Sequence, residues 1–190
     1  YNQLSFYIQD EWSILSNFKL LAGIRTDLFY FPELAMANSE VAKTFSEATD
    51  FTEKGLRTDI NPAPISFSPR IGFNWDIFDD KTTQLRGGIG IFSGRTPGVW
   101  LSNQYANTGM DLARADIRDP SFQFTEELGF NPPKFASPNT EINLIDPNFK
   151  MPQIFRANLA YDQELPYGFF ATVELIYGNT IYDVMYKNIN

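Results

Sequence analysis

The chain has 190 residues, a formal net charge of −8, and neither cysteine nor histidine. Its acidity argues against binding to nucleic acid, because phosphates require a basic protein surface. The missing cysteine excludes a disulfide framework, and the missing histidine removes the commonest general base and metal ligand. No run of about 18 apolar residues occurs, so a transmembrane helix is not predicted, whereas a transmembrane β-barrel is compatible with the sequence.

Six segments alternate between apolar and polar residues with a period of two, which predicts β-strands with two chemically different faces. In chain order they cover residues 4–14, 18–30, 65–77, 83–93, 153–165 and 169–181. The third is the most regular: from Ile65 to Ile77 every odd position is apolar or proline, and every even position is polar or glycine. A strand of about 13 residues tilted near 45° rises about 30 Å, the thickness of a bilayer core.

The links between these segments alternate between short and long. Residues 15–17, 79–82 and 166–168 are short turns, whereas residues 31–63 and 94–150 are long connections. In an up-and-down meander all short turns then lie on one side and all long loops on the other, as in outer-membrane barrels. We therefore predict an all-β fold, an antiparallel up-and-down transmembrane β-barrel with its apolar face toward lipid. The alternative is a soluble β-sandwich, whose apolar faces would pack on each other.

Most charged residues of the strands fall in the polar phase, which the barrel interpretation directs toward the lumen, although Asp10 interrupts the apolar phase of the first strand. They form either a solvated wall with weak cross-strand ion pairs or a surface that holds a plug by hydrogen bonds. Gly72, Gly88 and Gly90 lie inside strands, so we expect them to make room on the inner face and not to bind phosphate. The candidate lumen-facing and plug-contacting residues are Arg25, Asp27, Arg70, Arg86, Arg156 and Glu174.

The second long connection combines aromatic and amide side chains, which suits ligand capture at the cell surface. Trp100, Asn103, Gln104 and Tyr105 are the candidate ligand-binding residues. The alternative is that these side chains pack the loop onto itself. In the first long connection, SEVAKTFSEA (39–48) predicts a short surface helix.

Acidic residues of the turns and loops do not form a recognisable catalytic or metal site. The pairs Asp79–Asp80 and Glu126–Glu127 lie in a tight turn and a long loop, not on the rigid scaffold that glycoside hydrolysis needs. The spacing of Asp111, Asp116 and Asp119 matches no EF-hand loop. We therefore predict no catalytic residue, no metal site and no cofactor.

The hairpin LSFYIQDEWSILSNFKLLAGIRTDLF resembles the barrel signature of TonB-dependent outer-membrane receptors. The stretches SPRIGFNWDIFDDKTTQLRGGIGIFSGRTP and NFKMPQIFRANLAYDQELPYGFFATVELIYG are similar to the following hairpins in the Oar-like branch of that family. The similarity spans nearly all six strands and fades in the loops. In the first hairpin the matching residues are Tyr7, Gln9, Asp10, Trp12, Gly23, Arg25 and Asp27.

The resemblance implies that residues 1–190 are part of a 22-stranded barrel in the outer membrane that takes up a bulky nutrient. Its implied partners are outer-membrane lipid, the unknown nutrient, and a plug domain of the same protein that couples to the TonB complex. The chain opens and stops within strand-like sequence, so we expect a fragment without its plug domain and signal peptide. A surface adhesin or secretion-associated barrel without transport is the alternative from another functional class.

Overall fold

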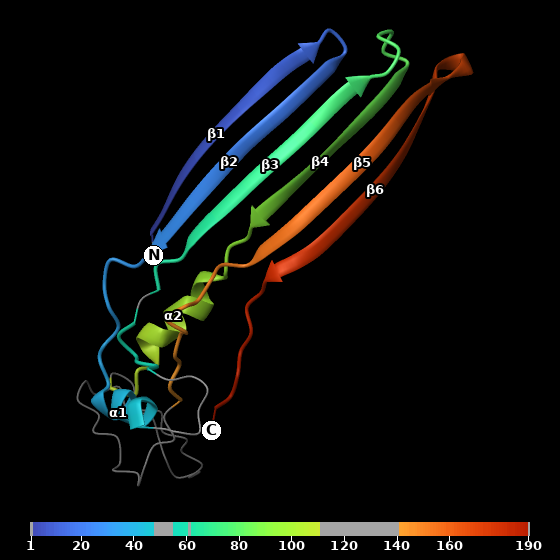
Figure 1. The fold of residues 1–190 in the computed structure, drawn as a ribbon. Coiled ribbons are helices and arrows are strands. Elements are labelled where there is room, and N and C mark those ends of the chain that lie inside the picture. Colours follow the sequence, from blue (N-terminus) through green and yellow to red (C-terminus); the bar gives the residue numbers. More distant parts are fainter. Residues whose placement is uncertain (1, 48–54, 61, 111–140, 190) are drawn as a thin grey trace, which may run out of the picture. The chain divides into compact units, whose positions relative to one another are not determined.

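A computed structural model describes residues 2–47, 55–60, 62–110 and 141–189. These residues belong to two compact units (Figure 1). The first comprises Tyr1–Pro32, Ala63–Pro97 and Asn148–Asn190, and the second comprises Glu33–Pro62 and Gly98–Pro147. The first unit therefore holds the predicted strands, and the second is built from the two long connections.

The first unit is a six-stranded antiparallel sheet in which each strand pairs with its neighbour in the sequence. The strands are β1 (Asn2–Leu15), β2 (Phe18–Tyr30), β3 (Ile65–Asp76), β4 (Thr83–Ser93), β5 (Gln153–Leu165) and β6 (Phe169–Tyr182). The predicted all-β, up-and-down fold is confirmed, with strand ends within two residues of those expected from the alternation. Among the described residues, β1 and β6 are the unpaired edges of the sheet.

The short turns contain residues whose backbone or side-chain chemistry suits a reversal of the chain. Between β3 and β4, Asp79 and Lys81 have positive φ, and a carboxylate oxygen of Asp80 accepts hydrogen bonds from the amide and hydroxyl of Thr82. The Thr82 hydrogen bonds hold the pKa of Asp80 below its usual range. Between β5 and β6 the 3-10 turn η1 (Pro166–Gly168) places Gly168 at a φ of 78°, which glycine adopts without a Cβ penalty.

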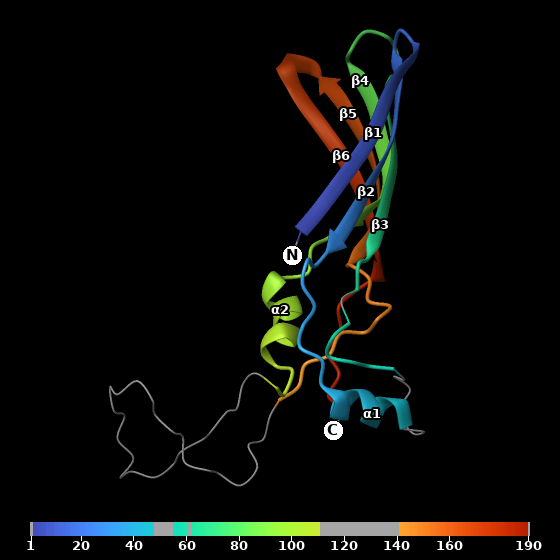
Figure 2. The ribbon, with the colours of Figure 1, turned by 90° about the vertical axis from the view of Figure 1, so that its left-hand side faces the viewer.

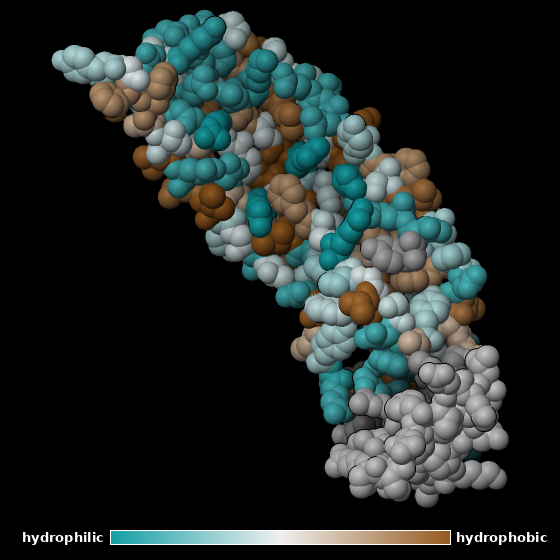
Figure 3. All heavy atoms as spheres, turned by 180° about the vertical axis from the view of Figure 1, so that it is seen from behind, coloured by the Kyte–Doolittle hydropathy of each residue, from teal (hydrophilic) through white to brown (hydrophobic). Residues whose placement is uncertain are grey.

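The two faces of the sheet differ in the way the alternation predicts. The exposed fractions of Ile8, Phe67 and Leu175 are 72%, 57% and 70%, although a soluble protein would bury many such side chains. No second sheet covers this apolar face within the described part of the chain, so the β-sandwich alternative is not the fold. Figure 2 shows that the sheet is curved: the central strands β3 and β4 bulge to one side, and the edge strands β1 and β6 bend toward the other. Seen from behind, the concave face carries hydrophilic residues along its length with hydrophobic residues between them (Figure 3).

The second unit contains two short helices and a small core of its own. Helix α1 (Ser39–Glu47) confirms the helix expected at this place in the first long connection. The side-chain oxygen of Asn38 accepts hydrogen bonds from the amides of Glu40 and Val41, the geometry of an N-cap. Val41, Phe45 and Leu101 are buried.

Helix α2 (Gly98–Ala106), in the second long connection, was not predicted. The proline just before it, Pro97, is of a type that is common at the start of a helix. None of the helices in the described residues is long and apolar enough to cross a membrane.

Candidate functional site: the polar face of the sheet

The concave face of the sheet carries hydrogen-bonded clusters that join several strands. Because alternate residues of a strand point to the same face, the register of the sheet decides which polar side chains meet. Tyr7 pairs with Arg25, Ser5 with Asp27, and Arg25 in turn with Ser68. The outer half of this face, on the side of the long connections, therefore gathers polar groups from β1, β2 and β3.

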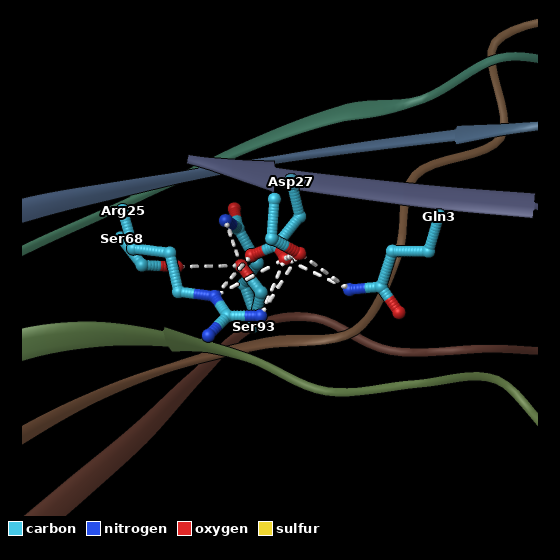
Figure 4. Close-up of polar contacts among 7 residues, drawn as sticks. Gln3, Arg25, Asp27, Ser68 and Ser93 are labelled. Carbon is cyan, nitrogen blue, oxygen red and sulfur yellow. Dashed lines mark hydrogen bonds and ion pairs between the residues drawn. The ribbon is translucent and has the colours of Figure 1, made fainter. Parts of the chain in front are cut away.

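Asp27 is the centre of the first cluster, which we call the Asp27 network (Gln3, Ser5, Arg25 and Asp27). Only 3% of Asp27 is exposed. Its carboxylate accepts hydrogen bonds from the Gln3 amide at 2.8 Å and the Ser5 hydroxyl at 2.6 Å. The guanidinium of Arg25 donates to both carboxylate oxygens, with its Nε 2.9 Å from Oδ2 (Figure 4). A buried carboxylate satisfied by this many donors holds its neighbours in fixed positions.

A second cluster of side-chain hydrogen bonds connects β3, β4 and β5 where the backbone pairing of β3 with β4 ends. Their paired register ends at Arg70 and Gly90, next to Pro69, which has no backbone N–H to donate. The side chain of Gln153 donates to the carbonyl of Phe67 at 3.1 Å and to the hydroxyl of Ser93 at 2.8 Å. The hydroxyls of Ser68 and Ser93 are 2.9 Å apart (Figure 4). Proline inside a strand is the sequence signal that could have indicated this break.

Arg86 and Glu174 lie toward the end of the face that carries the short turns. Arg86 forms an ion pair with Asp162 at 2.8 Å, and Asp162 also accepts a hydrogen bond from Thr172. Glu174 accepts a hydrogen bond from the side chain of Asn158 at 3.0 Å. The structure thus brings Arg25 and Asp27 together, whereas Arg86 and Glu174 have separate partners.

Two arginines of the face have no acidic partner among the described residues. Arg70 donates to the neutral side chain of Gln9 at 2.7 Å, and Arg156 makes no side-chain hydrogen bond or ion pair there. Both line an open cavity of about 370 Å³ whose floor includes Gly72 and Gly88. These two glycines pair directly across β3 and β4, so the predicted space on the inner face is present.

The predicted ligand-binding residues of the second long connection lie in or beside α2. Gln104 is 1% exposed, and its amide donates to the backbone carbonyls of Thr58 and Ile60. The hydroxyl of Tyr105 donates to the carbonyl of Glu33 at 2.7 Å. These contacts join the two long connections and favour the alternative, in which Gln104 and Tyr105 pack the loop. Trp100 is exposed and Asn103 is half-buried, and their role in ligand binding stays a prediction.

Acidic residues considered as catalytic or metal-binding candidates add no site. Glu126–Glu127 and the three aspartates 111, 116 and 119 lie outside the described residues. Within the described part of the chain, no group of three or more acidic side chains is arranged to hold a metal ion. Asp80 accepts hydrogen bonds from Thr82 within its own turn, as described above.

Comparison with known proteins identifies one family and no individual relative. The sequence matches the family described as "Outer membrane beta barrel domain" over residues 1–190. Neither the curated proteins nor the solved structures include a significant match. The family agrees with the long strands, the exposed apolar face and the polar concave face. The chain therefore belongs to the outer membrane β-barrel domain family, and its six antiparallel strands form barrel wall in the outer membrane.

Proposed function

We propose that this protein is a TonB-dependent receptor that takes up a bulky nutrient across the outer membrane. The observation that carries the proposal is the position of the residues that resemble the receptor signature. Gln9 pairs with Gly23, and Tyr7 pairs with Arg25, so these residues and Asp27 lie together on the polar face. Five of the seven matching residues thus form one connected part of the polar face, whereas Asp10 and Trp12 alternate onto the apolar face.

The polar face is suited to contact with a plug domain that occupies the lumen. The half-exposed Arg25, held in place by the buried Asp27, presents hydrogen-bonding groups without a change of conformation, which lowers the cost of binding a plug. Arg70, Arg86, Arg156 and Glu174 extend this polar surface along the strands. In this proposal the described sheet forms wall and carries no catalytic step, metal or cofactor.

The second unit supports a role in recognition at the cell surface. Its two connections are held together by the amide of Gln104, which fixes α2 against residues 58 and 60. In this arrangement Gln104 positions the loop, and Trp100 and Asn103 are the residues proposed to contact the nutrient. Aromatic surface and amide groups supply contact area and directional hydrogen bonds, respectively.

Uptake is tested with cells that contain or lack the full-length protein, each with and without a functional TonB complex. The loss of each solute from a defined medium is followed by mass spectrometry. The proposal predicts at least one bulky solute whose loss requires both the protein and TonB. Loss that continues without TonB, or equal loss without the protein, contradicts it.

The loop assignment is tested separately by replacing Trp100, Asn103 and Tyr105 singly with alanine in the full-length protein. Binding of the solute found above and proteolysis of the loop are measured together. Weaker binding of the Trp100 and Asn103 variants without faster proteolysis supports direct contact. Unchanged binding in all three variants refutes the loop assignment while leaving the transport proposal intact.

A further inference from the structure

A row of alternating arginine and glycine residues crosses the polar face at the middle of the strands. Each arginine of this arginine–glycine row has a glycine beside it on both neighbouring strands, and the ring of Phe92, two residues along β4, lies next to Gly90. From β1 to β6 the paired residues are Gln9, Gly23, Arg70, Gly90, Arg156 and Gly178.

The arginines of this row differ from the other cations of the sheet in their charge balance. Lys19, Arg25 and Arg86 each form an ion pair with a carboxylate on the same face. Among the described residues, no carboxylate oxygen lies within 4.0 Å of the side-chain nitrogens of Arg70 or Arg156. Gln9 orients Arg70 but is neutral, so the positive charge of both guanidinium groups is uncompensated.

The glycines add no side chains of their own to the wall between the two arginines, where the ring of Phe92 lies against Gly90. A Cβ atom added at Gly90 would lie 3.1 Å from the Cβ atom of Arg70, and one added at Gly88 would lie 3.0 Å from the carbonyl oxygen of Ile71. Larger residues would therefore crowd the neighbouring strand and fill the space in front of the row. The space is the open cavity of about 370 Å³, which lies within the size range of small-molecule sites.

The cavity has charges of opposite sign along its length. Arg70 and Arg156 line it together with Asn158 and Glu174. Glu174 accepts a hydrogen bond from Asn158, and this carboxylate disfavours a second anionic group near it. Because Leu21, Phe92 and Ile176 also line it, the cavity is suited to a solute with one oxyanion and an uncharged body that has both polar groups and apolar surface.

We propose that the arginine–glycine row is a binding site for the carboxylate or phosphate group of a small solute, such as a sugar acid or a sugar phosphate. A guanidinium has a planar set of donors that matches an oxyanion, and strands β3 and β5 are about 10 Å apart, so one solute reaches both arginines. The uncharged part of the solute lies over Gly72 and Gly88 and hydrogen-bonds to Asn158. The site does not depend on energy-driven uptake, but it requires that a plug domain leave Arg70 and Arg156 uncovered.

The test uses the purified full-length protein in detergent and titrates it with glucose 6-phosphate at low ionic strength by calorimetry. Arg70→Gln and Arg156→Gln are each expected to weaken binding about tenfold or more, because each removes charge-assisted hydrogen bonds. Lys19→Gln removes the same charge from the same face but from an existing ion pair, so it should leave binding unchanged. Glucose, which lacks the oxyanion, should not bind at the concentrations used.

Heat-dependent mobility on a gel verifies that each variant is folded before titration. The proposal is overturned if the unaltered protein does not bind glucose 6-phosphate, or if both arginine variants bind it as tightly as the unaltered protein does. Equal weakening by Lys19→Gln also overturns it, since general attraction by the face would then explain binding. The titration is made at equilibrium without an energy source, so its result is separate from that of the TonB-dependence experiment.

Discussion

Replacing Asp27 with alanine should destabilise the barrel more than replacing any exposed charge of the same face. The side chain of Asp27 is 5% exposed, and it accepts hydrogen bonds from Gln3, Ser5 and Arg25. Its loss leaves the Gln3 and Ser5 donors partly unsatisfied and Arg25 without its counter-charge. Each hydrogen bond to a charged group contributes about 1.5–3 kcal/mol, although the exposure of Arg25 reduces its share. We therefore expect a loss of about 3 kcal/mol in the free energy of unfolding.

The matched control is Glu11→Gln, which breaks the ion pair with Lys19 on the same face. Both side chains of that pair are about half exposed, at 51% and 56%, so its loss should cost about 0.5 kcal/mol or less. The assay is urea unfolding of the full-length protein in lipid vesicles, followed by tryptophan fluorescence. If Asp27→Ala shifts the unfolding midpoint no more than Glu11→Gln does, the Asp27 network does not stabilise the wall as argued.

Three further predictions concern the faces, the packing of the sheet and the second unit. Phe73→Arg should cost about 2–4 kcal/mol of folding free energy in vesicles, whereas Asn74→Arg should be tolerated, and equal losses would mean that the faces are misassigned. Gly87→Ala should lower the urea midpoint of unfolding, because the added Cβ would lie 2.8 Å from a backbone oxygen. The control Gly178→Ala should leave the midpoint unchanged, because its Cβ would meet no atom closer than 3.6 Å. Equal midpoints for the two variants would contradict the packing. Tyr105→Phe removes the hydroxyl that bonds to a loop carbonyl, so limited proteolysis of the second unit should become faster, and an unchanged rate would refute this anchoring role.

The strands could be predicted because their alternation continues over the whole length of each element. From Ile65 to Asp76 the polar and apolar residues alternate without exception, and an error of one residue would turn Arg70 toward lipid. The short turns at residues 15–17, 79–82 and 166–168 then made the antiparallel order of neighbouring strands predictable. The same alternation predicted that the side chains of Arg25, Arg86 and Arg156 face the lumen.

The contacts between side chains could not be predicted, because they depend on register and on local breaks of the sheet. The pairing of Gly90 with Arg156 joins strands that are separated by a long connection, whose length does not determine the register. Arg25 forms its ion pair with Asp27 of its own strand, because the residues directly opposite it, Tyr7 and Ser68, are uncharged. The side chain of Gln153 hydrogen-bonds to β3 near Pro69, where the backbone pairing of β3 with β4 has ended. Predicting this contact would require knowing where the two strands separate.

Helix α2 could not be predicted for a different reason. Its stabilising contacts come from the other long connection, where Thr58 and Ile60 accept hydrogen bonds from Gln104. Such contacts between distant segments have no local sequence pattern. The aromatic and amide residues of this stretch were recognised as unusual, but the structure assigns part of that chemistry to packing.

The central claim is that the apolar face of the sheet contacts lipid and the polar face lines the lumen. It is tested most directly by placing a fluorescent bimane label on Ile71→Cys and, separately, on Asn74→Cys in the full-length protein, after reconstitution into vesicles that contain doxyl-labelled lipid. Residues 1–190 contain no cysteine that would compete for the label, and any cysteine elsewhere in the full-length protein is first replaced. The account predicts strong quenching by lipid at position 71 and quenching only by a water-soluble agent at position 74. The reverse pattern, or equal quenching by lipid at both positions, would contradict it.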